Sequence, residues 1–382
     1  MEKNSLTFLV PCLNEEKTLS FVLEKIQKVR GNELKEFETE LIVSDNGSTD
    51  NSVNIAKSKG AKVIHCKKRG YGAALDFGIR NANSEYIIFA DADDTYDFLE
   101  APKLFLEAIK GYDLVIGNRL NSNLRKNSMP FLHRYIGTPV LNFIINLLYS
   151  NKKNRIKDCN SGFRCFRKDS YLNWNVTGTG MEFASEMLVK ALNNNAKISH
   201  VPVTLYPDHA DRIPHLKTWQ DGMRHLLQIF VESPQFFFKF GITLFLPSLI
   251  GIVIGWLFGP VNIIGFSIFG IHTMLILLFA GVIGISIFGI GLGLSVSKNN
   301  IPRTYKFLLN LSEDKLFWSS VLILFISFSF IISLFILWGL KGFSNIDFSK
   351  DTVFFIAIGT FGIELVSTII FSHLIKRTKS IH

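Results

Sequence analysis

The stretch EYIIFADADDTYD, residues 85–97, joins a short apolar run directly to a cluster of acids. An apolar run of this kind predicts a buried strand, and the acids then stand at its carboxyl end. Asp91 and Asp93 offer hard oxygen ligands that suit Mg²⁺ or Mn²⁺, which would share its remaining coordination with substrate phosphates and water. Taken alone, a D-x-D pattern is equally typical of a solvated turn whose acids cap a helix.

The segments around this stretch repeat the same alternation of short apolar runs and amphipathic helical patterns. The runs are LTFLVPCL (6–13), ELIVSDNG (40–47), AKVIHC (61–66), YDLVIGN (112–118), NSGFRCFRKD (160–169) and ISHVPVTLYPD (198–208), with a helix beginning near Met181. This alternation predicts an α/β fold of βαβ units around a mainly parallel sheet. Ligands bind beyond the carboxyl ends of such strands. The expected strand ends carry Asn14, Asp45, Asp91 and Asn118.

The second half of the chain is much more apolar than the first. The 382 residues are 48% hydrophobic and have a mean hydropathy of +0.25, and the apolar excess begins at about Phe236. No Asp, Glu, Lys or Arg lies between Phe240 and Ser297, which is room for two spans of about 20 residues each. We therefore expect a soluble head of residues 1–214 and a transmembrane domain of residues 236–382. Its four spans are expected at about 240–258, 266–296, 316–340 and 352–375.

Residues 215–235, between the head and the spans, carry apolar residues at helical spacing. The apolar positions are Leu216, Trp219, Met223, Leu226, Leu227 and Phe230, with Lys217, Arg224 and His225 at other positions. This pattern favours an amphipathic helix that lies on the membrane surface. The alternative is a helix that closes the soluble core.

The number and flanks of the spans predict an orientation. An even number of spans returns the C-terminus to the side of the head. The loops on that side carry the basic residues Lys298, Arg303, Lys306, Lys315, Lys376, Arg377 and Lys379, which predicts a cytoplasmic head and C-terminus. The N-terminal segment lacks the long apolar core of a signal peptide, and the four cysteines lack zinc-ligand spacing, as expected for a cytoplasmic head.

The distribution of charge along the chain indicates which partners to expect. The net charge is +9, but much of the basic excess sits beside the membrane spans, where anionic lipid headgroups explain it. We therefore expect membrane lipids and no nucleic acid as partners, and the sequence leaves a homo-oligomer open.

Glu364 lies inside the fourth span, where a carboxyl group is costly unless it is paired or faces a polar cavity. It is expected either to act in function or to pair with polar groups on a neighbouring span.

Three other stretches converge on the expected edge of the sheet: PCLNEEKTL (11–19), SDNGSTDNS (44–52) and KRGYGAALDFGI (68–79). Together with the D-x-D pattern they resemble the inverting, nucleotide-sugar-dependent glycosyltransferases of family 2, which have the GT-A fold. The resemblance implies that Pro11, Asn14 and Glu16 wall the nucleotide pocket and that Asp45 contacts the base or ribose. It also implies that Arg69, Gly70 and Gly72 approach the phosphates. The family commonly has a second Asp at the position of Asn46.

A narrower resemblance covers the rest of the head. GNR (117–119), DCNSGFRCFRKD (158–169), GMEFASEMLVKA (180–191) and VPVTLYPD followed by Arg212 are similar to polyprenyl-phosphate glycosyltransferases, the group of dolichyl-phosphate mannose and glucose synthases. That group transfers one sugar from a UDP- or GDP-sugar to a lipid monophosphate at the cytoplasmic face.

This narrower resemblance also implies roles for single residues. It assigns the acceptor phosphate to Arg119 and Arg134, and the donor diphosphate to Arg212 with Lys217. Asp158 and Glu182 become candidates for contacts with sugar hydroxyl groups or for a weak base. The chain departs from the D-x-D-x-Q pattern of many lipid-phosphate mannosyltransferases, because Thr95 stands where a third ligand is expected and only Asp94 is near enough in sequence to compensate.

Two other functions compete with this interpretation. A processive polysaccharide synthase would have a similar head, but it carries a Q-x-x-R-W motif near the membrane entrance, which the nearest text, WQDGMRHL, lacks. A non-catalytic membrane scaffold or lipid translocator would have lost the motif residues. Asp91, Asp93, Arg69 and Arg119 are all present, which argues against that alternative.

Overall fold

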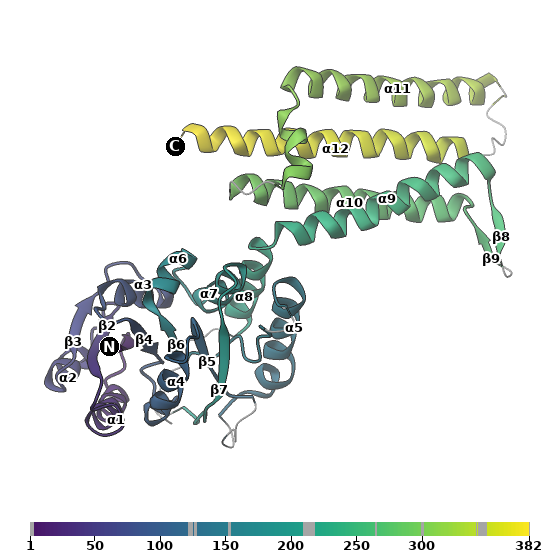
Figure 1. Ribbon diagram of the computed structural model, residues 1–382. Coiled ribbons are helices and arrows are strands. Elements are labelled where there is room, and N and C mark those ends of the chain that lie inside the picture. The colour runs from purple at the N-terminus through teal and green to yellow at the C-terminus, as the bar shows by residue number, and fades with distance from the viewer. Residues whose placement is uncertain are drawn as a thin grey trace. The chain divides into compact units, whose positions relative to one another are not determined.

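The computed structural model describes residues 4–120, 125, 128–151, 154–208, 218–263, 266–298, 302–340, 342 and 350–381. The chain forms two compact units, a head (Met1–Glu232) and a tail (Ser233–His382). The head is an α/β unit and the tail is helical (Figure 1).

The head is built on a seven-stranded sheet. The strands are β1 (Ser5–Cys12), β2 (Glu38–Asp45), β3 (Lys62–His65), β4 (Tyr86–Phe89), β5 (Leu114–Asn118), β6 (Arg164–Arg167) and β7 (Ile198–Pro202), in the order β3-β2-β1-β4-β6-β5-β7. Neighbouring strands are parallel except at β6, which runs antiparallel to β4 and β5. The predicted mainly parallel sheet is therefore confirmed.

Helices cover both faces of this sheet, because alternate strand residues point to opposite sides and both sides are apolar. Phe8 and Val10 of β1 belong to one buried cluster and Leu9 belongs to the other. The first face is covered by α1 (Leu19–Gly31), α2 (Ser52–Ser58), η1 (Phe98–Glu100) and α4 (Ala101–Ala108). The second is covered by α3 (Tyr71–Asn81), α5 (Thr138–Leu148), α6 (Lys168–Trp174), α7 (Phe183–Asn193) and α8 (Thr218–Val231).

Helix α8 lies within the segment for which we expect a membrane-surface helix. One of its faces packs into the head: Ile229 is buried in the second cluster, and the His225 ring lies 3.0 Å from the Ser185 hydroxyl of α7. On its other face Met223 and Leu227 are exposed. The helix thus closes the core with one side, while its contact with a membrane stays a prediction.

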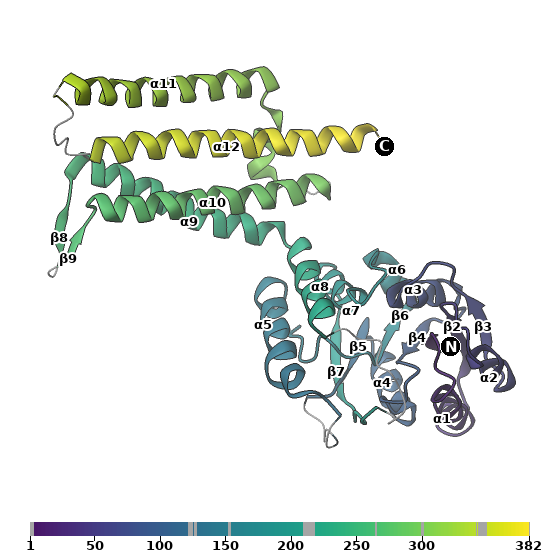
Figure 2. The ribbon, with the colours of Figure 1, turned by 180° about the vertical axis from the view of Figure 1, so that it is seen from behind.

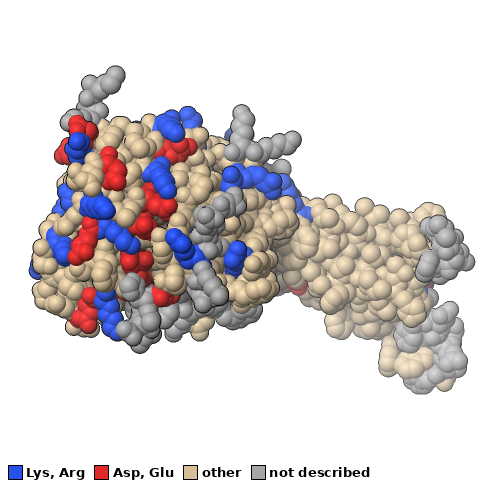
Figure 3. Space-filling model, turned by 90° about the horizontal axis from the view of Figure 1, so that it is seen from below, with Lys and Arg blue, Asp and Glu red and all other residues tan. Residues whose placement is uncertain are grey.

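The tail contains four helices that are long and apolar enough to span a membrane: Pro234–Phe258, Ile271–Ser297, Asp314–Leu340 and Lys350–Thr378. They belong to α9 (Pro234–Phe258), α10 (Ile271–Ser297), α11 (Glu313–Leu340) and α12 (Lys350–Ile381), seen from two sides in Figures 1 and 2. The face of the tail seen in Figure 3 shows almost no charged side chains, whereas the head carries both signs intermixed. A further short helix, η3 (Arg303–Asn310), follows α10.

Two of these helices begin at other residues than the expected spans do. The first helix begins at Pro234, whose missing N–H is no loss in a first turn. The second helix begins at Ile271, after an antiparallel hairpin of β8 (Val261–Ile263) and β9 (Phe266–Ile268). The residues near 266 are as apolar as a span, so composition alone did not separate the hairpin from the helix.

Glu364 pairs with a polar group on a neighbouring helix. Its Oε1 accepts a hydrogen bond of 2.8 Å from the Ser286 hydroxyl of α10, and the two residues border a hollow of about 580 Å³ with Ser367 and Thr368. This is one of the two outcomes expected from the sequence. The bond joins α10 to α12 and offsets the cost of a carboxyl group in an apolar segment.

Candidate active site

The predicted site residues meet at one edge of the sheet. Because β1, β2, β4 and β5 run in the same direction, their carboxyl ends share that edge. Asp45 is the last residue of β2 and pairs in register with Cys12 at the end of β1. Asn118 ends β5, and Asp91 follows β4 by two residues.

Asp91 and Asp93 are held by different neighbours. The Tyr71 hydroxyl donates to Asp91 Oδ1 at 2.8 Å. Asp93 is buried and accepts two hydrogen bonds from Thr95, at 3.1 Å from the backbone N–H and 2.6 Å from the hydroxyl. Thr95, which stands in the place of a third ligand, therefore orients Asp93.

Asp94, the residue near enough in sequence to compensate for Thr95, forms an ion pair. Its φ is +63°, and its Oδ1 forms a 2.8 Å ion pair with Lys25 of α1. Lys25 would therefore compete with a metal ion for this carboxylate. Asp91 and Asp93 stay the expected metal ligands.

The donor set fits a hard divalent cation. Within the described ranges, no group of three or more His, Cys, Asp or Glu side chains gathers as a complete cage. Mg²⁺ is commonly held by one or two carboxylates and takes its other ligands from water and substrate phosphates. Two aspartates at an open sheet edge match that pattern, and the role of each in binding a metal stays a prediction.

Asp45 is a pre-oriented hydrogen-bond acceptor at the edge. Its carboxylate accepts from the backbone N–H groups of Gly47 (3.2 Å) and Ser48 (3.0 Å), and His65 Nδ1 lies 3.0 Å from Oδ2. Burial opposes ionisation of this group, but the hydrogen bonds outweigh burial, so the pKa of Asp45 lies below its usual value. The group is an anion at neutral pH and suits contacts with N–H or O–H donors.

Asn14 and Glu16 tie the first loop to the loop after β2. Asn14, with a φ of +56°, accepts from the backbone N–H of Thr49 at 2.8 Å, and Glu16 accepts from that of Asn51 at 3.0 Å. Pro11 is buried within β1. The three residues expected to wall the nucleotide pocket thus lie at the right edge, and two of them form bonds that hold its loops together.

The R-G-Y-G loop is fixed by Asn46, the residue that replaces the family's second Asp. Asn46 Oδ1 accepts from the Gly70 backbone N–H at 2.7 Å, and its Nδ2 donates to the Lys68 carbonyl at 2.7 Å. A carboxylate has no N–H to donate to that carbonyl. Asparagine in place of aspartate at position 46 therefore stabilises the R-G-Y-G loop.

The two glycines of this loop are required by close approach. Gly70 has a φ of +131°, and a Cβ at that position would lie 2.1 Å from the Thr179 carbonyl oxygen. A Cβ at position 72 would lie 2.5 Å from the Gly178 carbonyl oxygen. The Arg69 side chain packs on Gly47, because a Cβ added at position 47 would lie 3.3 Å from the guanidinium carbon of Arg69. These contacts bring the segments around residues 46, 70 and 179 together.

Arg119 and Asp158 form a buried bidentate pair. Arg119 Nε and Nη2 each donate to Asp158 at 2.8 Å, and the Arg119 backbone N–H adds a bond of 3.0 Å. Burial opposes the ionised carboxylate, but the guanidinium outweighs it and keeps the pKa of Asp158 low. A carboxylate with both oxygens engaged and a low pKa is a poor proton acceptor, so the structure favours a positioning function for Asp158 over that of a base.

Arg164 is a site residue that the sequence did not single out. Its side chain is fully buried and donates to three backbone carbonyls, those of Ser161 (3.0 Å), Ala184 (2.8 Å) and Cys159 (2.9 Å). Burial lowers the pKa of Arg164 from its ordinary value. The residue lies in the quoted segment NSGFRCFRKD, but its type and spacing there gave no signal that it is buried.

Tyr96 connects the two parts of the site. Its hydroxyl accepts from the Gly162 backbone N–H at 2.8 Å, and a Cβ at position 162 would lie 2.7 Å from Asp91 Oδ2. Burial, opposed by the charge of Arg119, raises the pKa of Tyr96 to about 12. The loop from Asp158 to Gly162 therefore reaches from the arginine pair to the aspartate of the D-x-D pattern.

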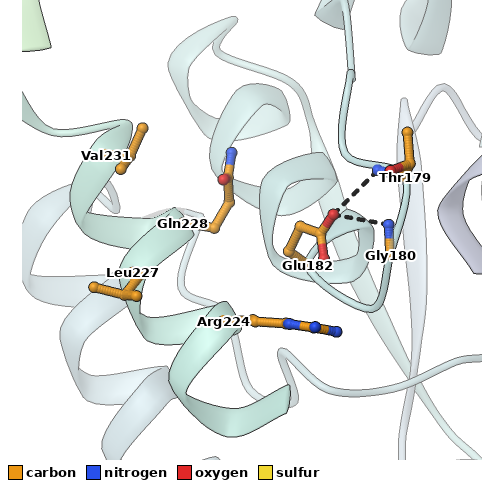
Figure 4. A pocket seen from close by; sticks show the side chains of 7 residues that line it. All are labelled: Thr179, Gly180, Glu182, Arg224, Leu227, Gln228 and Val231. Carbon is orange, nitrogen blue, oxygen red and sulfur yellow. Dashed lines mark hydrogen bonds between the residues drawn. The ribbon is translucent and has the colours of Figure 1, made fainter. Parts of the chain in front are cut away.

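Glu182 holds the loop that precedes α7. It accepts from the backbone N–H groups of Thr179 (3.1 Å) and Gly180 (2.7 Å). Glu182 borders a hollow of about 470 Å³ that is also lined by Arg224, Leu227 and Gln228 of α8. Figure 4 shows these side chains and the two hydrogen bonds of Glu182. Glu182 is thus placed next to an open space, and its two hydrogen bonds indicate that it orients the loop.

Of the remaining basic residues that were expected to bind phosphate, the structure describes Arg134. Arg134 is exposed, and its guanidinium lies over the ring of Tyr135, 5.2 Å from the centroid. Burial lowers the pKa of the adjacent His133, and the positive charge of Arg119 lowers it further, so the segment that carries Arg134 is near the arginine pair. Arg212 and Lys217 lie outside the described residues.

Comparison with known proteins identifies the family of the head. Residues 7–173 match the model of glycosyl transferase family 2. The head is a family 2 glycosyltransferase domain. The expected family is thereby confirmed, and all four motif stretches at the sheet edge fall inside the matched residues.

Relatives of this glycosyltransferase domain extend beyond the matched segment. The low-salt glycan biosynthesis hexosyltransferase Agl6 of Haloferax volcanii is 33% identical over 70% of this chain and 63% of its own length, so the chain spans under two thirds of that relative. A dolichyl-phosphate hexose transferase of the same organism is 27% identical over 52% of this chain and 82% of its own length.

A solved structure supports the fold of the glycosyltransferase domain. The glucosyl-3-phosphoglycerate synthase of Mycobacterium tuberculosis, in complex with Mn²⁺, UDP-glucose and phosphoglyceric acid, has a TM-score of 0.50 and 18% identity. The match covers 60% of this chain and 80% of that one. At this identity the likeness shows the fold alone, and it confirms GT-A.

We predict that Asn46→Asp destabilises the glycosyltransferase domain by about 1–3 kcal/mol, because the Lys68 carbonyl loses its donor and faces a carboxylate. Chemical denaturation of the purified protein measures this. Asn54→Asp, at an exposed asparagine of α2, is the matched control and should change stability little. Equal effects of the two substitutions would contradict a bracing function of Asn46.

We predict that Asp158→Asn costs about 3–5 kcal/mol of stability near neutral pH, because it leaves the buried Arg119 without its counter-charge. The folded-state pKa of Asp158 is lowered, so its contribution is present above the usual Asp pKa of about 3.9 and is lost as the pH falls through the lower folded value. Unfolding measured from pH 7 down to pH 3 should show the difference between the two proteins shrinking only at the acid end. A difference that already shrinks near pH 6 would contradict this assignment.

Proposed function

We propose that the protein is a metal-dependent, inverting glycosyltransferase that moves one sugar from a nucleotide-sugar to a polyprenyl phosphate. The observation that carries the proposal is the loop from Asp158 to Gly162. At one end it forms the buried pair with Arg119, and at the other it lies against Asp91. The arginine proposed for the acceptor phosphate and the aspartate proposed for the cation are thus connected through five residues of chain.

The proposed sugar transfer requires compensation of negative charge more than it requires a group that accepts a proton. An oxygen of the lipid phosphate, already an anion at neutral pH, attacks the anomeric carbon of the sugar. The bond from that carbon to the diphosphate breaks, the nucleoside diphosphate leaves with the electron pair, and the configuration inverts. Because the nucleophile carries no proton, the weak basicity of Asp158 is no obstacle.

On the donor side, the two aspartates would hold Mg²⁺ or Mn²⁺, which supplies positive charge to the departing diphosphate when it is bound. Asp45 accepts from the base or ribose, between loops that Asn14 and Glu16 tie together. Arg69, Gly70 and Gly72 approach the phosphates, and Arg212 with Lys217 adds positive charge there.

On the acceptor side, Arg119 and Arg134 draw the lipid phosphate into line behind the sugar. Asp158 fixes the guanidinium plane of Arg119 and thereby its remaining N–H groups. Glu182, beside the open hollow, contacts sugar hydroxyl groups or keeps its loop in place for them.

The location proposed for this reaction follows from the tail. Four apolar helices make the protein an integral membrane protein, and the basic loops favour a cytoplasmic head and C-terminus. Polyprenyl phosphate and membrane lipids then share the bilayer with the enzyme. The printed names of the relatives, a hexosyltransferase of glycan biosynthesis and a dolichyl-phosphate hexose transferase, support a hexose as the sugar and a polyprenyl lipid as the acceptor.

We predict that Asp93→Asn lowers transfer by at least about a hundredfold, because it removes a charged ligand that compensates the leaving group. Isolated membranes are incubated with a panel of labelled UDP- and GDP-sugars, with and without added polyprenyl phosphate, and extracted with organic solvent. Asp94→Asn is the matched control, since Lys25 already engages that carboxylate, and it should retain most activity. Label that is insoluble in the organic phase would indicate a polymer, and no label from any donor would favour a scaffold.

We predict that Arg134→Ala raises the KM for polyprenyl phosphate about tenfold, the loss of one exposed phosphate contact of about 1.4 kcal/mol. The KM for the nucleotide-sugar should stay within twofold of the original. Arg167→Ala serves as the control, because Arg167 lies at the opposite edge of the sheet. A change confined to the donor KM would contradict the assignment of Arg134.

A further inference from the structure

Three polar side chains stand one helical turn apart on one side of α5. Thr138, Asn142 and Asn146 are spaced by four residues, so they lie on the same side of the helix. We call this row the polar ladder. Asparagine is unfavourable inside helices, because its amide competes with the backbone for hydrogen bonds. The two asparagines of α5 are therefore explained by the partners that they bind and not by helix formation.

Both asparagines of the polar ladder bind the backbone of the loop before β6. Asn146 accepts from the Ile156 backbone N–H and donates to the Ile156 carbonyl, each at 2.8 Å. Asn142 accepts from the Cys159 backbone N–H at 2.9 Å and donates to the Lys157 carbonyl at 2.8 Å. An amide offers both a donor and an acceptor, so each asparagine pairs with the loop as a neighbouring strand would. These bonds fasten the loop to α5.

The fastened loop carries Asp158. This residue lies among those that α5 binds, and it forms the buried bidentate pair with Arg119. Thr138, the third member of the polar ladder, accepts from the side chain of Asn160 at 3.2 Å, two residues beyond Asp158. The polar ladder therefore binds the loop on both sides of Asp158 in the sequence and holds α5 against the Arg119 pair.

Residues outside α5 hold the same loop to the sheet. Arg164 Nη2 of β6 donates to the Cys159 carbonyl at 2.9 Å, and His200 Nε2 of β7 accepts from the Lys157 backbone N–H at 3.2 Å. The loop and the Arg119 pair thus keep their attachment to the sheet when a bond to α5 is lost. Removal of an asparagine of the polar ladder should free α5 more than it frees the loop.

Arg134 lies at the start of the helix that carries the polar ladder. Residues 131–148 are helical throughout, and Arg134 stands one turn before the polar ladder, in the π-helical turn η2 (His133–Gly137). Turns of this rare type are frequent at functional sites. Burial and the positive charge of Arg119 lower the pKa of His133, so this turn lies near the Arg119 pair. One helix therefore connects Arg134 to the loop that holds Arg119.

We propose that Asn142 and Asn146 are positioning residues that set the separation of Arg134 and Arg119, so that the two arginines form one binding site for the acceptor phosphate. This inference rests on the proposed function, in which these arginines bind that phosphate. The asparagines act through α5 and the loop of Asp158, without contact to the phosphate. The separation matters because a shift of about 1 Å in a binding group can cost up to about a hundredfold in rate.

The first test compares the acceptor with the donor. Asn142→Ala and Asn146→Ala in the full chain should each raise the KM for polyprenyl phosphate about fivefold and change the KM for the nucleotide-sugar less than about twofold. Asn54→Ala is the matched control, because Asn54 is an exposed asparagine of α2 whose amide donates to Asn51. A rise in both KM values, or a loss confined to kcat, would overturn the inference.

A double-mutant cycle tests whether Asn142 acts through Arg134. In the Arg134→Ala background, Asn142→Ala should raise the KM for polyprenyl phosphate less than about 1.5-fold, because the position of the missing arginine no longer matters. The full fivefold effect of about the original size in that background would mean that Asn142 acts on something else, and it would overturn the inference.

A second test measures the position of α5 without catalysis. Nitroxides are attached to Ile136→Cys in η2 and Leu106→Cys in α4, whose native side chains are 51% and 45% exposed. The four native cysteines are buried, so the new thiols are labelled selectively. Double electron–electron resonance on the full chain should give a broader distance distribution after Asn142→Ala or Asn146→Ala.

The control and the other outcomes of this distance measurement decide between the two proposals. Asn54→Ala should leave the distribution as it is in the parent protein. An unchanged distribution after Asn142→Ala would overturn the inference, whether or not the preparation transfers sugar. A broader distribution in a preparation that transfers no sugar from any donor would refute the proposed function and leave the polar ladder as the element that places Arg134 relative to Arg119.

Discussion

The buried pair of Arg119 and Asp158 is the interaction on which the site depends. Two charges withdrawn from water are costly unless geometry and hydrogen bonds compensate the loss. Here both guanidinium bonds measure 2.8 Å and the Arg119 backbone N–H adds a third, so the carboxylate is satisfied only when the end of β5 and the loop before β6 are in register. The pair therefore fixes the position of that loop, and with it Gly162 against Asp91.

The proposed donor side depends on the close approach of backbone segments. Asn46 bonds to the R-G-Y-G loop, and the Ala73 backbone N–H donates to the Thr179 carbonyl at 3.0 Å. Side chains at positions 70 and 72 would keep these segments apart. One half of the site is thus held by a charge pair and the other by backbone contacts, and Tyr96 with Gly162 joins the halves. Such a site has little freedom to rearrange, which suits a reaction that depends on positioning.

The sequence predicted those features that follow from burial or from residue type. All seven strands were expected. The central strands β1 and β4 are apolar runs because both of their faces are buried, and the aspartates after β4 indicated a site. The bonds of Asn46 and Arg164 were not predicted, because their partners are backbone groups that only the folded chain brings near. The hairpin near 266 was not predicted, because its residues are as apolar as those of the helix that follows.

The segment D-A-D-D-T departs from the D-x-D-x-Q pattern at its last position. Thr95 donates to Asp93 and Lys25 engages Asp94, so Asp91 and Asp93 are the carboxylates proposed to hold a cation. The glutamine of that pattern is a neutral ligand, so its replacement by threonine leaves the negative charge of the proposed site unchanged. A divalent cation held by two carboxylates would take its remaining ligands from water and substrate phosphates. The replacement of a third ligand by threonine is therefore compatible with an active site.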